Sequence, residues 1–110
     1  MESWFEISTA ANGQFRFALK AGDGHTLLVS ELYHSKESAH GGIVSVQKNC
    51  GSDARYEKKV ATNGKFFFNL RAANNQVIGT SQMYASEQDR DAGIAASKAS
   101  GATAPVRVNA

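Results

Sequence analysis

The chain has few of the features that mark a secreted or membrane protein. It contains a single cysteine, Cys50, so no disulfide can form within it, and a reducing compartment fits this composition. No apolar run approaches the roughly 18 residues of a membrane span. The first six residues include two glutamates where a signal peptide carries positive charge. We therefore expect a cytoplasmic protein with no membrane partner.

The sequence also lacks a strong charge of either sign. Twelve basic against ten acidic residues give a net charge of +2, and 42% of the 110 residues are hydrophobic, as in one ordinary globular domain. The basic residues concentrate in 48–71, which holds six of them and two acidic residues. A net charge this small identifies no partner, so the partner is unknown at this stage.

What the sequence does contain is an internal duplication. Shifting the chain by 51 residues places 5–50 on 56–101 without a gap and gives 13 identities in 46 positions. These identities fall on turn, core and helix-cap positions: Glu6/Glu57, Ala10/Ala61, Asn12/Asn63, Gly13/Gly64, Phe15/Phe66, Phe17/Phe68, Leu19/Leu70, Ala21/Ala72, Ser30/Ser81, Tyr33/Tyr84, Ser35/Ser86, Gly42/Gly93 and Ile43/Ile94. The pattern predicts a single domain over 1–110 made of repeats 5–54 and 55–110. Because two copies can pair internally, a monomer is favoured.

Each repeat is predicted to contain three antiparallel strands, a helix and a further strand. In the first repeat, apolar alternation marks strands at 5–7, 15–21 and 26–30, with Asn12-Gly13 as a tight turn. Ser35 is the expected N-cap of a helix. The recurrence of Gly42 at Gly93 predicts a close approach of each helix to the sheet, since Gly costs stability in a helix interior.

The second repeat follows the same plan. Strands are expected at 55–60, 66–71 and 77–81, and Ser86 is expected to cap a helix that ends near Ala99. A last strand at 106–108 follows Pro105, which a strand tolerates at its start.

These residues carry a resemblance to a known family. The frame is similar over nearly the whole chain to the YegP-like family of small uncharacterised bacterial proteins, in its two-copy form. The segments that carry it are Trp4-Phe5-Glu6, Gln14 to Phe17, Leu19 to Gly22, Ser30 to Tyr33, Arg55 to Lys59, Asn63 to Phe66, Asn69-Leu70, Ala72 to Asn74 and Ser81 to Ala85. The resemblance implies an α+β fold of two tandem β-β-β-α-β repeats that form one antiparallel-rich sheet, with both helices on one face and exchanged C-terminal strands, 55–60 and 106–108. It implies no activity, catalytic residue or ligand.

The residue types that carry out catalysis or bind metals do not converge in this sequence. The three histidines and Cys50 form neither a Cys-x-x-Cys nor a His-x3-His pair, and there is no Gly-x-Ser-x-Gly elbow or phosphate loop. Cys50 lies on the apolar stripe of the first helix and is expected to be an inert core residue. We therefore expect a protein that is not an enzyme, with no metal, cofactor or catalytic residue.

The most informative surface is the sheet face opposite the helices. It is expected to display Arg16, Lys20, Lys65, Phe67 and Arg71, which place four cations around one aromatic ring. Single-stranded nucleic acids bind faces of this kind, although one ring is a thin stacking platform and a solvated sheet would look the same. Tyr33 and Tyr84 either line a cleft or plug the corner between strand and helix.

We interpret the chain as a non-enzymatic binding or interaction module of unknown ligand. The alternatives are a small-molecule site or enzyme at the junction between the repeats, and weak binding of single-stranded nucleic acid on the candidate face.

Overall fold

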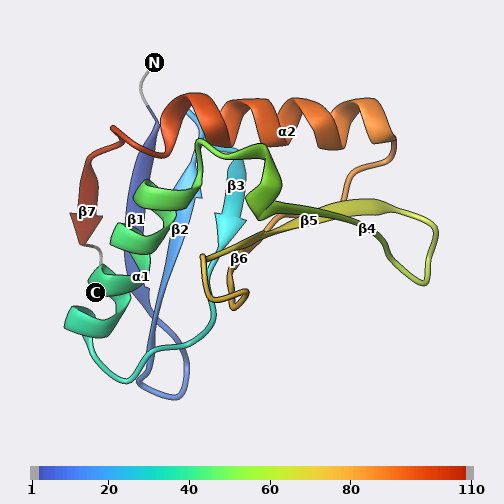
Figure 1. Cartoon of the computed structure of the whole chain (residues 1–110). Coiled ribbons are helices and arrows are strands. Elements are labelled where there is room, and N and C mark those ends of the chain that lie inside the picture. Colours follow the sequence, from blue (N-terminus) through green and yellow to red (C-terminus); the bar gives the residue numbers. More distant parts are fainter. Residues whose placement is uncertain (1–2, 109–110) are drawn as a thin grey trace.

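The computed structural model describes residues 3–108, in which two helices cover one face of a seven-stranded mixed sheet (Figure 1). The elements, in chain order, are β1 (Trp4–Thr9), β2 (Phe15–Lys20), β3 (Thr26–Val29), α1 (Lys36–Asn49), the 3-10 turn η1 (Asp53–Arg55), β4 (Tyr56–Val60), β5 (Phe66–Arg71), β6 (Val77–Thr80), α2 (Glu87–Ser100) and β7 (Val106–Val108). The strand order across the sheet is β4-β5-β6-β3-β2-β1-β7. Each helix has 14 residues, and within 3–108 neither is long and apolar enough to cross a membrane.

The two repeats have the same local structure. The side chain of Ser35 accepts a hydrogen bond from the Ser38 N–H at the start of α1, and Ser86 accepts one from Asp89 N–H at the start of α2. Both β1–β2 and β4–β5 are antiparallel hairpins, and a register shift follows the same leucine position in β2 and in β5. The duplication, the caps and the strands predicted from the sequence are therefore confirmed.

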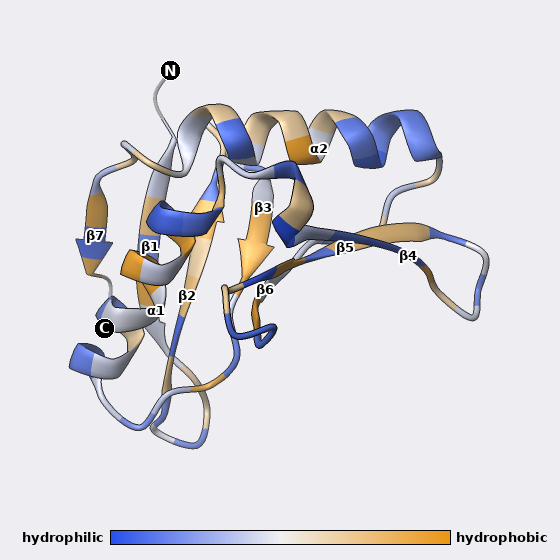
Figure 2. Cartoon of the chain, in the orientation of Figure 1, coloured by the Kyte–Doolittle hydropathy of each residue, from blue (hydrophilic) through white to orange (hydrophobic). Residues whose placement is uncertain are grey.

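One hydrophobic core runs under both helices. Alternate residues of the strands point to the helix side, so Phe17, Leu19, Phe68 and Leu70 are all fully buried. They join one core cluster with Ile43 and Val46 of α1, with Cys50 at the C-cap of α1, and with Ile94 of α2. Apolar colour is strong on β2 and β3 beneath the helices, whereas much of β4 is hydrophilic (Figure 2). The α+β fold with both helices on one face is thus confirmed.

The strand exchange is not reciprocal. β7 follows α2 and crosses to the first repeat, where it pairs in parallel with β1. The expected counterpart, residues 55–60, instead forms β4, which pairs antiparallel with β5 as the first strand of the second repeat. Only η1 and a few flanking residues lie between the end of α1 and β4. The first repeat therefore has no strand of its own after α1 that could pair with the second repeat as β7 pairs with β1. Within residues 3–108, β4 is therefore an edge strand of the sheet.

Candidate functional site

The candidate face predicted from the sequence is divided by two intervening strands. Arg16 and Lys20 lie on β2, whereas Phe67 and Arg71 lie on β5, and β3 and β6 separate these strands. At about 4.8 Å per strand, the two groups are about 14 Å apart. Lys65 precedes β5 in the hairpin turn and is exposed. The structure thus gives two small basic groups rather than one ring of cations around Phe67.

Several charges on this face are engaged within the chain. Arg71 Nη2 donates to Glu57 Oε1 at 2.8 Å, and its Nη1 donates to the backbone oxygen of Asn75. Hydrogen bonds from Asn69 and Arg71 lower the pKa of Glu57. Lys20 Nζ donates to Thr26 Oγ1 at 2.8 Å. A ligand for this face would compete with these bonds, and its binding there stays a prediction.

Trp4 and Arg107 were missed as members of the helix-free face. The Arg107 guanidinium lies 4.8 Å from the centre of the Trp4 ring, a cation–π contact between β1 and β7. With Glu6 and Val108 they line a hollow of about 340 Å³. Side chains alternate along β1, so Trp4 lies on the face away from the buried Phe5, and the sequence could have placed it on the helix-free face. Arg107 could not be placed in this way, because the pairing of β7 with β1 is not visible in the local pattern.

The junction between the repeats holds a depression of about 520 Å³ at β3 and β6. Two of its lining residues, Ser30 and Ser81, use their hydroxyl groups to bind the backbone. The Ser30 hydroxyl accepts a hydrogen bond from the N–H of Phe17, and the Ser81 hydroxyl accepts one from the N–H of Phe68, both at 2.9 Å. Each hydroxyl also donates to the carbonyl oxygen of the next residue in the chain. These hydroxyls hold the register of the sheet, which explains why the serine recurs in both repeats.

Tyr33 and Tyr84 plug the corners between sheet and helix. The Tyr33 ring stacks on Phe17 with centroids 6.1 Å apart, and the Tyr84 ring stacks in the same way on Phe68. Each tyrosine also exchanges two backbone hydrogen bonds with the first residue of β2 or β5. Burial raises the pKa of both hydroxyls. These contacts favour the structural interpretation of the tyrosines over a cleft.

The other candidate chemical groups are dispersed. Cys50 is fully buried against Gly101, and burial raises the pKa of its thiol, which disfavours the reactive thiolate. His25 pairs with Asp23 at 2.8 Å on an exposed turn. In the part of the chain that the structure describes, no three histidine, cysteine or carboxylate side chains gather as a metal site would require. Glu6 and Glu57 lie on β1 and β4, about 24 Å apart at five strand spacings, so they cannot act as a carboxylate pair.

A hollow of about 810 Å³ lies beside β4, within the size range of ligand pockets. We name it the β4–α2 groove; it is lined by Asp53, Tyr56, Lys58, Asp91, Ile94, Ala95, Lys98 and Ala99. Its α2 residues recur at helical spacing and so form one side of the helix. The groove combines an apolar floor with charged side chains at its rim.

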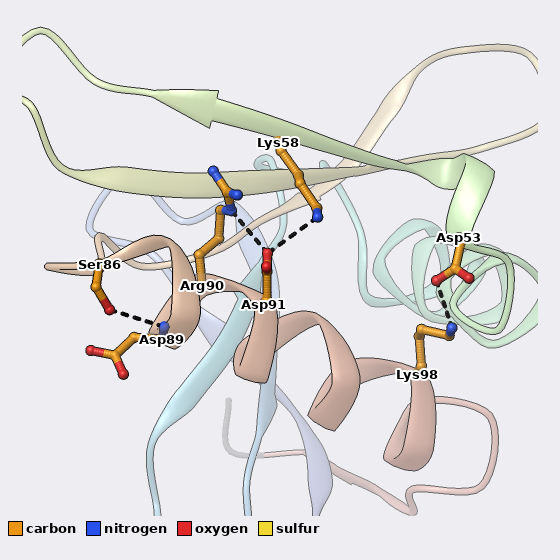
Figure 3. Close-up of polar contacts among 7 residues, drawn as sticks. All are labelled: Asp53, Lys58, Ser86, Asp89, Arg90, Asp91 and Lys98. Atoms are coloured by element: carbon orange, nitrogen blue, oxygen red, sulfur yellow. Dashed lines mark hydrogen bonds and ion pairs between the residues drawn. The ribbon is translucent and has the colours of Figure 1, made fainter.

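Ion pairs bridge the two walls of this groove (Figure 3). Lys58 Nζ on β4 lies 3.3 Å from Asp91 Oδ1 on α2, and Lys98 Nζ on α2 donates to Asp53 Oδ1 on η1 at 2.5 Å. Burial raises the pKa of Asp91, but hydrogen bonds from Lys58 and Arg90 outweigh this effect and lower it. Exposed ion pairs of this kind contribute little to stability, so a ligand can displace them at small cost.

Tyr56 lines the groove and is held in place by contacts beneath it. Its ring meets Phe68 edge to face at 5.6 Å, and its hydroxyl donates to the carbonyl oxygen of Cys50 at 2.6 Å. Burial raises the pKa of this hydroxyl, so it stays protonated and remains a donor. Tyr56 is therefore a fixed structural element of the groove rather than an acid or base.

The sequence held one signal for this groove that the interpretation missed. Under the shift of 51 residues, the buried Phe5 and Ile7 of β1 correspond to Tyr56 and Lys58 of β4. Lys58 therefore stands where the first repeat has the buried Ile7. A charged residue at this position indicates that β4 lacks the covering strand that β7 provides for β1. The divergence between the repeats, rather than their identity, marks this candidate site.

Comparisons with known proteins agree with the duplication. The domain of unknown function DUF1508 matches this chain twice, at residues 10–57 and 61–107. The UPF0339 protein YegP of Escherichia coli K12 is 58% identical over 109 residues, covering 99% of each chain, and a UPF0339 protein of Acinetobacter baylyi is 62% identical over 107 residues, covering 97% of this chain and 96% of its own.

Two solution NMR structures have the same fold. The structure of yegP from E. coli, described as a protein of unknown function, has a TM-score of 0.92 at 58% identity and covers 99% of this chain and 94% of its own. That of a UPF0339 protein of Shewanella oneidensis has a TM-score of 0.91 at 51% identity, covering 98% and 92%.

Proposed function

The chain belongs to the DUF1508 family of proteins of unknown function, and on that premise we propose that it is a non-enzymatic interaction module whose ligand binds the β4–α2 groove. The observation that carries this proposal is the position of the groove. It lies along β4, the edge strand of the second repeat, at the place where the first repeat has β7 beside β1.

The composition of the groove supports binding rather than catalysis. Its carboxylates, Asp53 and Asp91, are paired with Lys98 and Lys58, and the lowered pKa of Asp91 keeps it ionised near neutral pH. A general acid or base works best with a pKa near the working pH. The apolar floor offers surface that a ligand can bury, and hydrophobic burial is the main source of affinity in such sites.

The site can be tested by blocking it. A displayed library of random peptides is selected against the immobilised chain and then re-tested on two variants. Ala95→Arg places a long side chain in the groove, whereas Ala92→Arg makes the same change at an exposed position of α2 that does not line it. We expect the enriched peptides to bind wild type and Ala92→Arg and to lose binding to Ala95→Arg by at least about tenfold. Equal binding to both variants, or no enrichment over an empty support, would overturn the proposal.

We further propose that the protein acts as a monomer in the cytoplasm. The monomer is supported by the pairing of the two repeats within one sheet, and the reducing compartment by the single buried Cys50. Sedimentation velocity at micromolar concentration is expected to give one species near the chain mass of 11.8 kDa. A concentration-dependent dimer would contradict this part.

Weak binding of single-stranded nucleic acid remains the second proposal for the helix-free face. It is supported by Arg16 and Lys20 on β2 beside Trp4 on the neighbouring strand β1, whose ring gives this basic group a stacking surface of its own, separate from Phe67 on β5. Titration with labelled single-stranded RNA should show an affinity that falls steeply between about 50 and 200 mM salt, because basic side chains that contact phosphates release bound counterions. The absence of binding at low salt excludes this role.

A further inference from the structure

We propose that the β4–α2 groove takes an extended peptide segment of a partner protein, which adds to β4 as a parallel strand with a β-branched apolar side chain opposite Tyr56 and an acidic side chain opposite Lys59. This inference rests on the proposed function and names the class of ligand for the same site.

The chain itself contains the template for such a complex. β7 pairs in parallel with β1, with Val106 opposite Phe5 and Val108 opposite Ile7. The N–H of Phe5 donates to the carbonyl oxygen of Pro105 at 2.7 Å, and the half-buried Val106 packs against the core. The edge of the first repeat, β1, thus binds a short Val-x-Val segment as a parallel strand.

The second edge of the sheet has the same frame without the added strand. Tyr56, Glu57 and Lys58 are the equivalents of Phe5, Glu6 and Ile7 under the shift of 51 residues. β4 pairs with β5 in the register that β1 has with β2, because Phe5 faces Leu19 and Tyr56 faces the equivalent Leu70. The backbone groups of Tyr56 and Lys58 consequently point away from β5, as those of Phe5 and Ile7 point toward β7. Figure 1 shows β4 and β7 at opposite ends of the sheet.

One donor on this edge is already used, which limits the register. The N–H of Tyr56 donates to the carbonyl oxygen of Asp53 in η1, whereas the equivalent N–H of Phe5 donates to the carbonyl oxygen of Pro105, which directly precedes β7. The carbonyl of Tyr56 and the N–H and carbonyl of Lys58 are the groups that a parallel strand would pair with next. The incoming segment thus begins its pairing opposite Tyr56 and continues toward Val60.

The charges on β4 determine which segment fits. Lys58 and Lys59 are adjacent and exposed on this strand. An antiparallel pairing of β4 with the β4 of a second copy would bring these lysines together, and charged edge strands of this kind prevent such association. A segment with a carboxylate opposite Lys59 is attracted instead, because opposite charges on neighbouring strands stabilise a sheet. The occupant is therefore a different chain with alternating apolar residues and an acidic end.

The test uses the full chain and a synthetic peptide built on the template. The probe is Ala-Thr-Ala-Pro-Val-Arg-Val-Glu with blocked termini, which is residues 102–108 followed by a glutamate. Titrated into 15N-labelled protein, it is expected to shift the amide signals of 56–60 and 91–99 and to slow hydrogen exchange at the Lys58 amide. A nitroxide on the peptide N-terminus should broaden the signal of Tyr56 more than that of Val60, as a parallel strand requires.

Matched peptides and variants make the outcomes decisive. Replacing the terminal glutamate of the probe by lysine should weaken binding several-fold, and replacing its first valine by aspartate should weaken it by at least about tenfold. Ala95→Arg should abolish the shifts and Ala92→Arg should keep them. Shifts confined to β1 and β7 would overturn the inference, because the probe would then be exchanging with the chain's own strand.

The inference and the proposed function can fail separately. If library peptides bind the groove but the probe does not bind up to millimolar concentration, the strand proposal is wrong and the binding site stands. The same conclusion follows if the probe binds with no change in exchange at Lys58, or broadens Val60 first. If no peptide depends on the groove, the proposed function is wrong as well.

Discussion

At the scale of single residues, two adjacent glycines of α1 have different roles. A Cβ on Gly42 would lie 2.4 Å from the Tyr33 hydroxyl oxygen and 2.7 Å from a ring carbon of Phe17, whereas a Cβ on Gly41 would meet nothing within 4 Å. We expect Gly42→Ala to destabilise the protein by about 1–3 kcal/mol through overpacking. Gly41→Ala should stabilise it by about 0.5–1 kcal/mol, because alanine favours the helix. Urea unfolding followed by circular dichroism measures both.

A double variant tests the cause of this difference. Tyr33→Phe removes the nearest atom, so Gly42→Ala should cost less in that background than in wild type, and part of the cost should remain because of Phe17. Equal costs in both backgrounds would show that the hydroxyl does not set the limit. A loss of stability in Gly41→Ala would contradict the assignment of that glycine to an open surface.

Glu57 gives a prediction about pH. Hydrogen bonds from Asn69 and Arg71 lower its pKa in the folded chain below the value of about 4.3 found in unfolded peptides. Its ionised form therefore stabilises the fold above about pH 4.3, and this contribution is lost as the pH falls through the folded-state pKa. Glu57→Gln should be less stable than wild type at pH 6, and the difference should shrink toward pH 3. Urea midpoints measured across this range check it, and a difference that does not change with pH would contradict the assignment.

At the scale of elements, β7 shows how a three-residue strand contributes. Val106 is half-buried against the core, whereas Val108 is 53% exposed. Val106→Ser should destabilise the protein by about 1 kcal/mol or more, since burial of a complete valine side chain contributes about 1.5–3 kcal/mol. The matched change Val108→Ser should have a smaller effect. Thermal melts of the two variants compare them, and equal melting temperatures would mean that β7 does not pack as described.

The local pattern was sufficient to predict the elements but not their neighbours. Strand alternation, the Asn-Gly turns and the serine caps are local, so the bounds of β2, β5 and both helices follow closely from the sequence. The partner of β4 depends on tertiary structure, and for this reason residues 55–60 were wrongly expected to be an exchanged strand. The same limitation applies to the candidate face. Alternation places Arg16 and Phe67 on one side of the sheet, but the strand order separates them.

At the scale of the whole molecule, backbone pairing at the central junction of the two repeats is slight. β3 and β6 meet in a single registered pair, Val29 with Thr80. The repeats are joined more extensively by packing: α1 contacts β5 and β6 of the second repeat, and α2 contacts β3 of the first. Cys50 and Gly101, which are equivalent positions, lie in contact, and β7 completes the link to β1. Either repeat alone is near the size at which a core becomes marginal, so the two should fold as one unit.

Cooperativity can therefore be tested by damaging one repeat and observing the other. Leu70 is fully buried in the second repeat, and Leu70→Ala should cost about 2–5 kcal/mol. Trp4, the only tryptophan, reports on the first repeat. If packing through the helices and β7 couples the repeats, the urea midpoint from Trp4 fluorescence should fall together with the midpoint from circular dichroism. Val60→Ala, at a position 61% exposed, serves as the control and should leave both midpoints nearly unchanged. A Trp4 transition that keeps its wild-type midpoint in Leu70→Ala would show that the repeats unfold separately, and β7 would then contribute only local cover to β1.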